Sequence, residues 1–131
     1  CQVVCAFDAS FGAGLLDALG QVVVDGQPTL LIAYDSEYPE PLHSKRGISD
    51  CGGVALLLTP ERTQRSLARI TVTPTAEPAQ AFADGGLEGL RQDIPAMRSL
   101  PLLANLARGE PGQIRLDYLP PMQLNVALDP C

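Results

Sequence analysis

Two apolar segments that flank an amphipathic segment constrain the fold of this chain more than any other feature of its sequence. Gln2–Phe7, with two adjacent valines, and Thr29–Tyr34 are short apolar runs of the kind found in strands buried on both faces. Between them, apolar side chains recur at helical spacing over Phe11–Val22, and the turn signal Asp25–Pro28 ends this helix. A strand, a helix and a strand within about 35 residues predict a βαβ unit, whose two strands must be parallel.

The rest of the chain predicts more strands and helices around this unit. Val54–Leu58 is a third apolar run, and Arg69–Thr73 alternates as in a strand with one exposed face. Ser99–Gly109 carries the signals that begin and end a helix, and a terminal hairpin is expected around Pro120-Pro121. We therefore expect an α/β fold, with the βαβ unit in a mixed sheet and with helices flanking that sheet.

The composition narrows the class of protein. The 131 residues and 13.9 kDa suffice for one domain, and a hydrophobic content of 46% excludes a disordered chain. A formal charge of −6 without a basic stripe counts against nucleic-acid binding, and no apolar run reaches the ~18 residues of a membrane span. A strand pattern, and no signal-peptide pattern, follows directly after Cys1. We expect a single cytoplasmic domain over residues 1–131, as a fragment that lacks its N-terminal part.

The four cysteines permit disulfides, but their positions favour another interpretation. They are Cys1, Cys5, Cys51 and Cys131, an even number with two at the ends of the chain. Cys5 lies within the first apolar run, where a cysteine usually behaves as a small buried hydrophobic residue. Only one histidine, His43, accompanies the cysteines, which is too few ligands at too wide a spacing for zinc. We therefore expect no metal site, with disulfide pairing as the less favoured alternative to burial.

A polar loop with two prolines follows the second apolar run. Its acidic residues Asp35, Glu37 and Glu40 could ligate a metal in principle. The prolines between them hinder convergence, and basic residues lie nearby, so these charges are better explained as the solvated surface of a covering loop. Tyr34 and Tyr38 have rigid amphipathic rings that suit contacts in an interface.

The elbow between the first apolar run and the helix is a candidate for chemistry. Such elbows place a nucleophile at a helix N-terminus, where free N–H groups stabilise anions. Cys5 lies three residues before the elbow, inside the expected strand, and Ser10 lies near it with no evident base. Asp8 is best explained as the helix N-cap, and His43, the one histidine, as an exposed loop residue.

Gly12 and Gly14 resemble part of a dinucleotide-binding fingerprint, with Asp35 at the end of the following strand. The third glycine position is Asp17, whose charge would be unfavourable beside phosphate, and Gly12 already lies inside the expected helix. Small residues where the helix approaches its neighbours closely are the favoured explanation. A nucleotide-binding module is retained as an alternative.

Three segments in order carry a resemblance to a known family: CAFDASF at the elbow, TLLIAYDSEYPEPL at the second strand and its loop, and DCGGVALLLTPE at the third strand. Together they resemble the β-ketoacyl synthases of the thiolase fold over about residues 1–75. More narrowly, YDSEYPEPL and SDCGGVALLLTPE are similar to the short ketosynthase-like proteins called chain length factors of aryl polyene clusters. The resemblance implies a partial thiolase-like fold and a place in fatty acid or polyketide-type biosynthesis.

Carried over to this chain, the resemblance implies a subunit without catalytic residues. The family's nucleophilic cysteine corresponds to a position near Asp8, where no cysteine stands, and the family's two supporting histidines have no counterparts. Without a thiolate and imidazoles, condensation has neither nucleophile nor carbanion stabilisation. The resemblance further implies a heterodimer with an active β-ketoacyl synthase through the strand Gln2–Ala6, indirect contact with acyl carrier protein, and no cofactor. The alternative is an active acyltransferase or condensing enzyme that uses Cys5.

Overall fold

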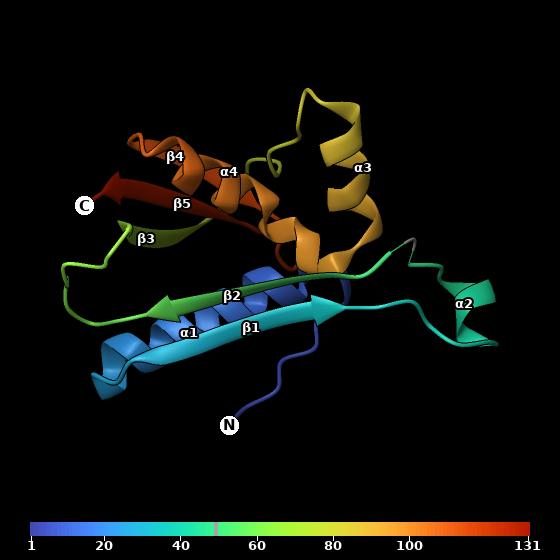
Figure 1. The fold of residues 1–131 in the computed structure, drawn as a ribbon, viewed down its shortest axis with the longest axis horizontal. Coiled ribbons are helices and arrows are strands. Elements are labelled where there is room, and N and C mark those ends of the chain that lie inside the picture. The colour runs from blue at the N-terminus through green and yellow to red at the C-terminus, as the bar shows by residue number, and fades with distance from the viewer. Residues whose placement is uncertain (49) are drawn as a thin grey trace.

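A helix between two antiparallel sheets forms the framework of the structure (Figure 1). The computed structural model describes residues 1–48 and 50–131. In chain order the elements are η1 (Phe7–Ala9), α1 (Ser10–Asp25), β1 (Thr29–Asp35), α2 (Leu42–Lys45), β2 (Gly52–Leu58), β3 (Ala68–Thr75), α3 (Gly85–Asp93), η2 (Pro95–Ser99), α4 (Leu100–Arg108), β4 (Gly112–Leu116) and β5 (Gln123–Pro130). This mixture of helices and strands confirms the coarse α/β expectation.

The structure confirms both the position of α1 and the apolar stripe from which it was predicted. Its apolar stripe buries Phe11, Leu15, Ala18 and Val22, which recur at the expected spacing. Gly26 ends the helix in the left-handed conformation that glycine adopts without strain. By length and composition alone the helical stretch 7–25 could cross a membrane. In this fold its buried stripe packs on protein, as in the core helix of a globular domain.

The strands β1 and β2 lie where the sequence predicts them, but the parallel βαβ unit is wrong. They pair with each other antiparallel, with Ile32 opposite Ala55, and the segment Gln2–Ala6 forms no strand in the described chain. The first apolar run has no neighbouring strand to accept its backbone hydrogen bonds. It is tied to α1 by the Gln2 amide, which bonds Asp17 and Gln21, and Val3 is 84% exposed. Cys5 is exposed as well, so its predicted burial is also wrong.

The second sheet has the order β3–β5–β4 and is antiparallel throughout. This sheet confirms the predicted alternating strand and the predicted terminal hairpin. The expected mixed sheet is wrong, because both sheets in the described chain are antiparallel. The central strand β5 buries Leu124, Val126 and Leu128 against α1 and α4. The outward side chains of β3, Arg69 and Thr71 among them, are polar and exposed, as in a sheet with one solvated face.

Candidate functional site at the elbow before α1

The elbow that leads into α1 is a tight, internally bonded turn. Phe7 has a φ of 50°, in the left-handed region that a bulky residue adopts only at a cost of roughly 1–3 kcal/mol. The Ser10 hydroxyl accepts a hydrogen bond from the Ala6 N–H at 3.0 Å and donates one to the Phe7 carbonyl at 2.7 Å. The Ala9 N–H donates to the Ala6 carbonyl at 2.9 Å. These bonds hold Phe7 in its strained conformation.

The exposed side chains at the elbow come from two separate segments. Asp8 forms an ion pair with Arg46, which follows α2, and the Arg46 guanidinium lies 5.7 Å from the centre of the Phe7 ring. The prediction that Asp8 caps α1 is therefore wrong: the 3-10 turn η1 places Asp8 before the cap position, which is Ala9, and its carboxylate turns to Arg46. The ion pair with a distant segment is beyond the reach of sequence spacing.

The nucleophile candidates are not brought together with a base. Cys5 is an exposed, free thiol, and no hydrogen bond to it is found in the described chain. The Ser10 hydroxyl is engaged with backbone atoms on both sides of the elbow. His43 is exposed on α2, as expected of a solvated residue, and bonds neither side chain. As arranged, the elbow offers an aromatic ring and a paired carboxylate, neither of which attacks an acyl group as a thiolate does.

The two glycines of the partial dinucleotide fingerprint face protein atoms. A Cβ on Gly12 would overlap the backbone carbonyl of Asp117, and one on Gly14 would stand 3.1 Å from Leu31 Cδ1. Gly12 thus faces the second sheet and Gly14 the first, which lets α1 fit between them. This is the close packing expected from the sequence, and it leaves no room at these glycines for a pyrophosphate.

The acidic loop residues serve local structure. The Asp35 carboxylate accepts a hydrogen bond from the Ala96 N–H at 2.6 Å, and Glu40 accepts one from the Ser44 hydroxyl at 2.5 Å. Within residues 1–48 and 50–131, no group of three potential metal ligands converges. All four cysteines are free and exposed, so no disulfide forms between them. Tyr34 and Tyr38 are exposed, as an interface role would require.

A buried ion-pair network was missed by sequence reasoning. Arg91 is 7% exposed and donates to both Glu88 oxygens, at 2.9 and 2.6 Å, and to Asp117 at 2.5 Å. Arg98 also pairs with Asp117, at 3.2 Å. Hydrogen bonds from Arg91, Phe82 and Gln92 hold the pKa of Glu88 well below its usual value, and the bond to Glu88 raises the pKa of Arg91. The i,i+3 spacing of Glu88 and Arg91 could have revealed half of the network.

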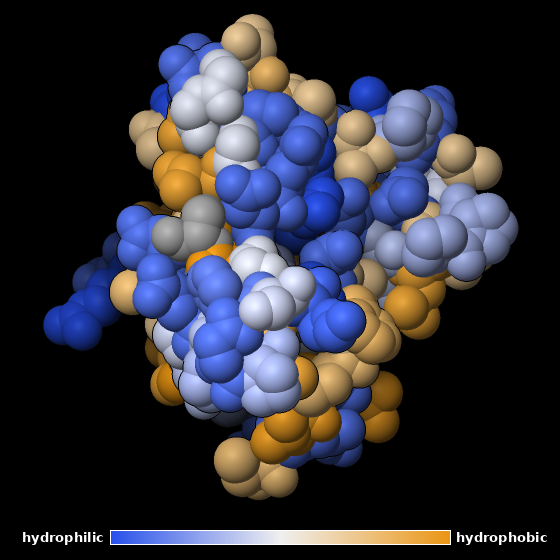
Figure 2. All heavy atoms as spheres, turned by 90° about the vertical axis from the view of Figure 1, so that its right-hand side faces the viewer, coloured by the Kyte–Doolittle hydropathy of each residue, from blue (hydrophilic) through white to orange (hydrophobic). Residues whose placement is uncertain are grey.

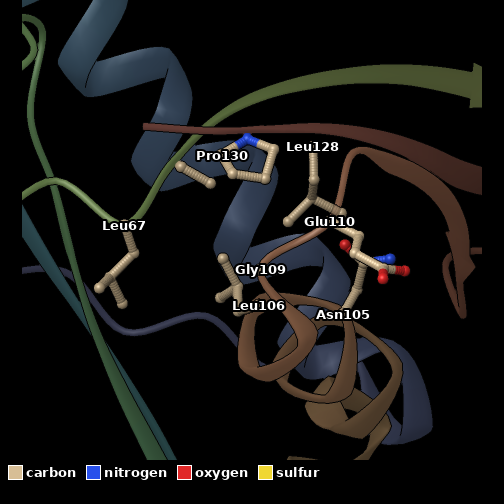
Figure 3. Close-up of a pocket in the computed structure, with 8 residues that line it drawn as sticks. Leu67, Asn105, Leu106, Gly109, Glu110, Leu128 and Pro130 are labelled. Carbon is tan, nitrogen blue, oxygen red and sulfur yellow. The ribbon is translucent and has the colours of Figure 1, made fainter.

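The cavity of Figure 3 is too small for a substrate. It lies where α4 meets the ends of β3 and β5, is lined by Leu67, Leu106 and Pro130, and holds only about 10 Å³. That volume is at the limit for a single water molecule. This cavity is therefore not a candidate site.

Comparisons with known proteins do not assign this chain to a family. No family model matches the chain, and no curated protein or solved structure matches it.

Proposed function

We propose that this chain is a catalytically inert ketosynthase-like subunit of the chain length factor type. In this proposal it pairs in the cytoplasm with an active β-ketoacyl synthase of fatty acid or aryl polyene biosynthesis. It meets acyl carrier protein only through that partner. The observation that carries the proposal is the elbow, where Phe7 and Asp8, and no cysteine, stand at the position to which the resemblance assigns the nucleophile of the family.

The chemistry of condensation explains why the absence of a cysteine at the elbow matters. An acyl-enzyme needs a thiolate at the end of a helix, where the N–H groups stabilise it and the oxyanion that forms on attack. In this chain the residue in the strained left-handed conformation at the elbow is Phe7, whose side chain is 82% exposed. The negative charge beside it belongs to Asp8 and is compensated by Arg46. A phenyl ring is not a nucleophile, and a carboxylate paired with Arg46 is a far weaker one than a thiolate.

The N-terminal segment supports pairing with another chain. Residues 1–5 make no backbone hydrogen bond to another strand in the described chain, and Val3 is 84% exposed. An apolar segment whose backbone N–H and C=O groups have no partner strand can pair with a strand of another chain. In the proposed complex, Gln2–Ala6 becomes a strand on the partner synthase.

Co-expression with a β-ketoacyl synthase from the same source, followed by co-purification, tests the proposal. We expect the two chains to elute together in equal amounts. A Val3→Lys variant, which places a charge in the proposed strand, is expected to weaken the complex at least tenfold. The matched control is Val24→Lys on α1, because Val24 is exposed to a similar extent, at 82%. Separate elution of the two unmodified chains contradicts the proposal.

A further inference from the structure

The outer face of the β1–β2 sheet is apolar along its whole length and has no cover in the described chain. It consists of Leu30, Ile32 and Tyr34 on β1 and of Gly53, Ala55 and Leu57 on β2. The four larger side chains among these are 58%, 59%, 78% and 66% exposed in the order Leu30, Ile32, Tyr34 and Leu57. We call this surface the open face. In Figure 1 it is turned toward the viewer, with α1 behind the sheet.

The open face differs in composition from the outer face of the second sheet. The second sheet of the same chain places polar residues outward on β3, including Arg69 and Thr71. Figure 2 shows the α2 end of the molecule, where hydrophilic residues dominate the centre of the surface and hydrophobic residues lie toward its margins. A strand that is apolar on both sides is typical of a sheet buried on both sides. The pattern therefore indicates that the β1–β2 sheet is suited to packing against a second layer of protein on its open face.

A second copy of the chain could pack on the open face without charge repulsion there, although the chain has a net charge of −6. The open face holds no charged residue. Asp35, the acidic residue at the end of β1, is turned to the opposite face and bonded to the Ala96 N–H. Two copies can thus bring their open faces together without placing carboxylates against each other.

The open face is also complementary to itself in size. Across the strand pair, Tyr34 lies opposite Gly53, Ile32 opposite Ala55 and Leu30 opposite Leu57. A two-fold axis parallel to the strands, between β1 and β2 in the plane of contact, would lay β1 of one copy over β2 of the other. Tyr34 and Ile32 of each copy would then sit over Gly53 and Ala55 of its mate, large on small. Two sheets stacked this way lie roughly 10 Å apart.

The area is sufficient for such a pair. The exposed side chains of the open face present on the order of 500 Å² of apolar surface, near the upper end for a monomer. Two copies would bury on the order of 1,000 Å² in total, the lower bound for a specific interface. From the apolar face, its size pattern and its area, we propose that this protein forms a two-fold symmetric homodimer through the open faces of two copies. The inference is independent of the proposed function.

Sedimentation of the purified chain and of charge variants tests the dimer. We expect the unmodified chain to sediment at twice its mass of 13.9 kDa at micromolar concentration. Ile32→Lys and Ala55→Asp, both on the open face, are each expected to halve that mass. Thr71→Lys, at an exposed strand position on the other sheet, is the matched control and is expected to stay dimeric. Circular dichroism establishes that each variant keeps its fold.

Mixing the two open-face variants tests the arrangement itself. In the proposed dimer, residue 32 of one copy lies over residue 55 of the other, so a chain with Ile32→Lys should pair with a chain carrying Ala55→Asp. We expect the mixture to regain the dimeric mass that each variant alone has lost. A monomeric unmodified chain, a dimeric Ile32→Lys variant, or a mixture that stays monomeric would each overturn the proposal. So would an open face that binds only a co-expressed synthase.

Discussion

The same substitution at two positions of α1 is expected to have opposite effects on stability. Gly12 and Gly20 both lie in this helix. A Cβ on Gly20 meets nothing within 4 Å, whereas one on Gly12 overlaps the Asp117 carbonyl. We therefore expect Gly20→Ala to stabilise the protein and Gly12→Ala to destabilise it. The pair tests whether α1 is packed tightly between the two sheets.

The expected magnitudes follow from helix propensity and overpacking. Alanine is better than glycine inside a helix by about 1 kcal/mol, and Gly20→Ala should realise most of this gain. At Gly12 the obstacle is a backbone carbonyl, which cannot rotate away like a side chain. Overpacking of this kind costs about 1–3 kcal/mol. Because both variants gain the same helix propensity, their unfolding free energies should differ by about this cost. Gly14→Ala should fall between them, because its neighbour at 3.1 Å is the movable end of Leu31.

Urea unfolding followed by circular dichroism measures these differences. The midpoints should rank Gly20→Ala above the unmodified protein, and Gly12→Ala below it, with equal slopes. A Gly12→Ala variant as stable as Gly20→Ala would refute the close approach of α1 to the second sheet.

Three further results are expected. The folded-state pKa of Glu88 is lowered from 4.5, so the ionised Glu88 stabilises the folded protein above about pH 4.5, and this stabilisation is lost as the pH falls below that value. In the Glu88→Gln variant the urea midpoint should therefore fall less steeply with acidification. Iodoacetamide should alkylate Cys5 no faster than an exposed, unactivated thiol, and a rapid reaction that Cys5→Ala abolishes would favour the enzyme alternative. Asp8→Asn should change the unfolding free energy by at most about 1 kcal/mol, since its pair with Arg46 is largely exposed; a larger loss would show that the pair holds the elbow.

Local patterns in the sequence predicted the elements whose causes are local. The spacing of Phe11, Leu15 and Val22, together with Gly26, was enough for α1, and the proline turn was enough for the β4–β5 hairpin. Helix stripes and turn residues act over a few positions, so a single sequence displays them.

Features that depend on distant partners could not be predicted in this way. The run Gln2–Phe7 has the composition of a strand, yet a strand exists only where another pairs with it. The direction of β1 against β2 depends on which strands become neighbours. The contacts of Asp8 with Arg46 and of Arg91 with Asp117 join residues 38 and 26 positions apart. The apolar run of β1 did indicate a sheet suited to burial on both sides, and this property defines the open face.

Intact-mass spectrometry of the chain and the synthase proposed as its partner, after incubation with an acyl-loaded carrier protein, tests the central claim most directly. If Phe7 and Asp8 leave the elbow without a nucleophile, the mass of one acyl group should be added to the synthase alone. This chain should keep its unmodified mass throughout turnover. An acyl adduct on this chain, mapped to Cys5 and lost in Cys5→Ala, would contradict the claim that it is catalytically inert.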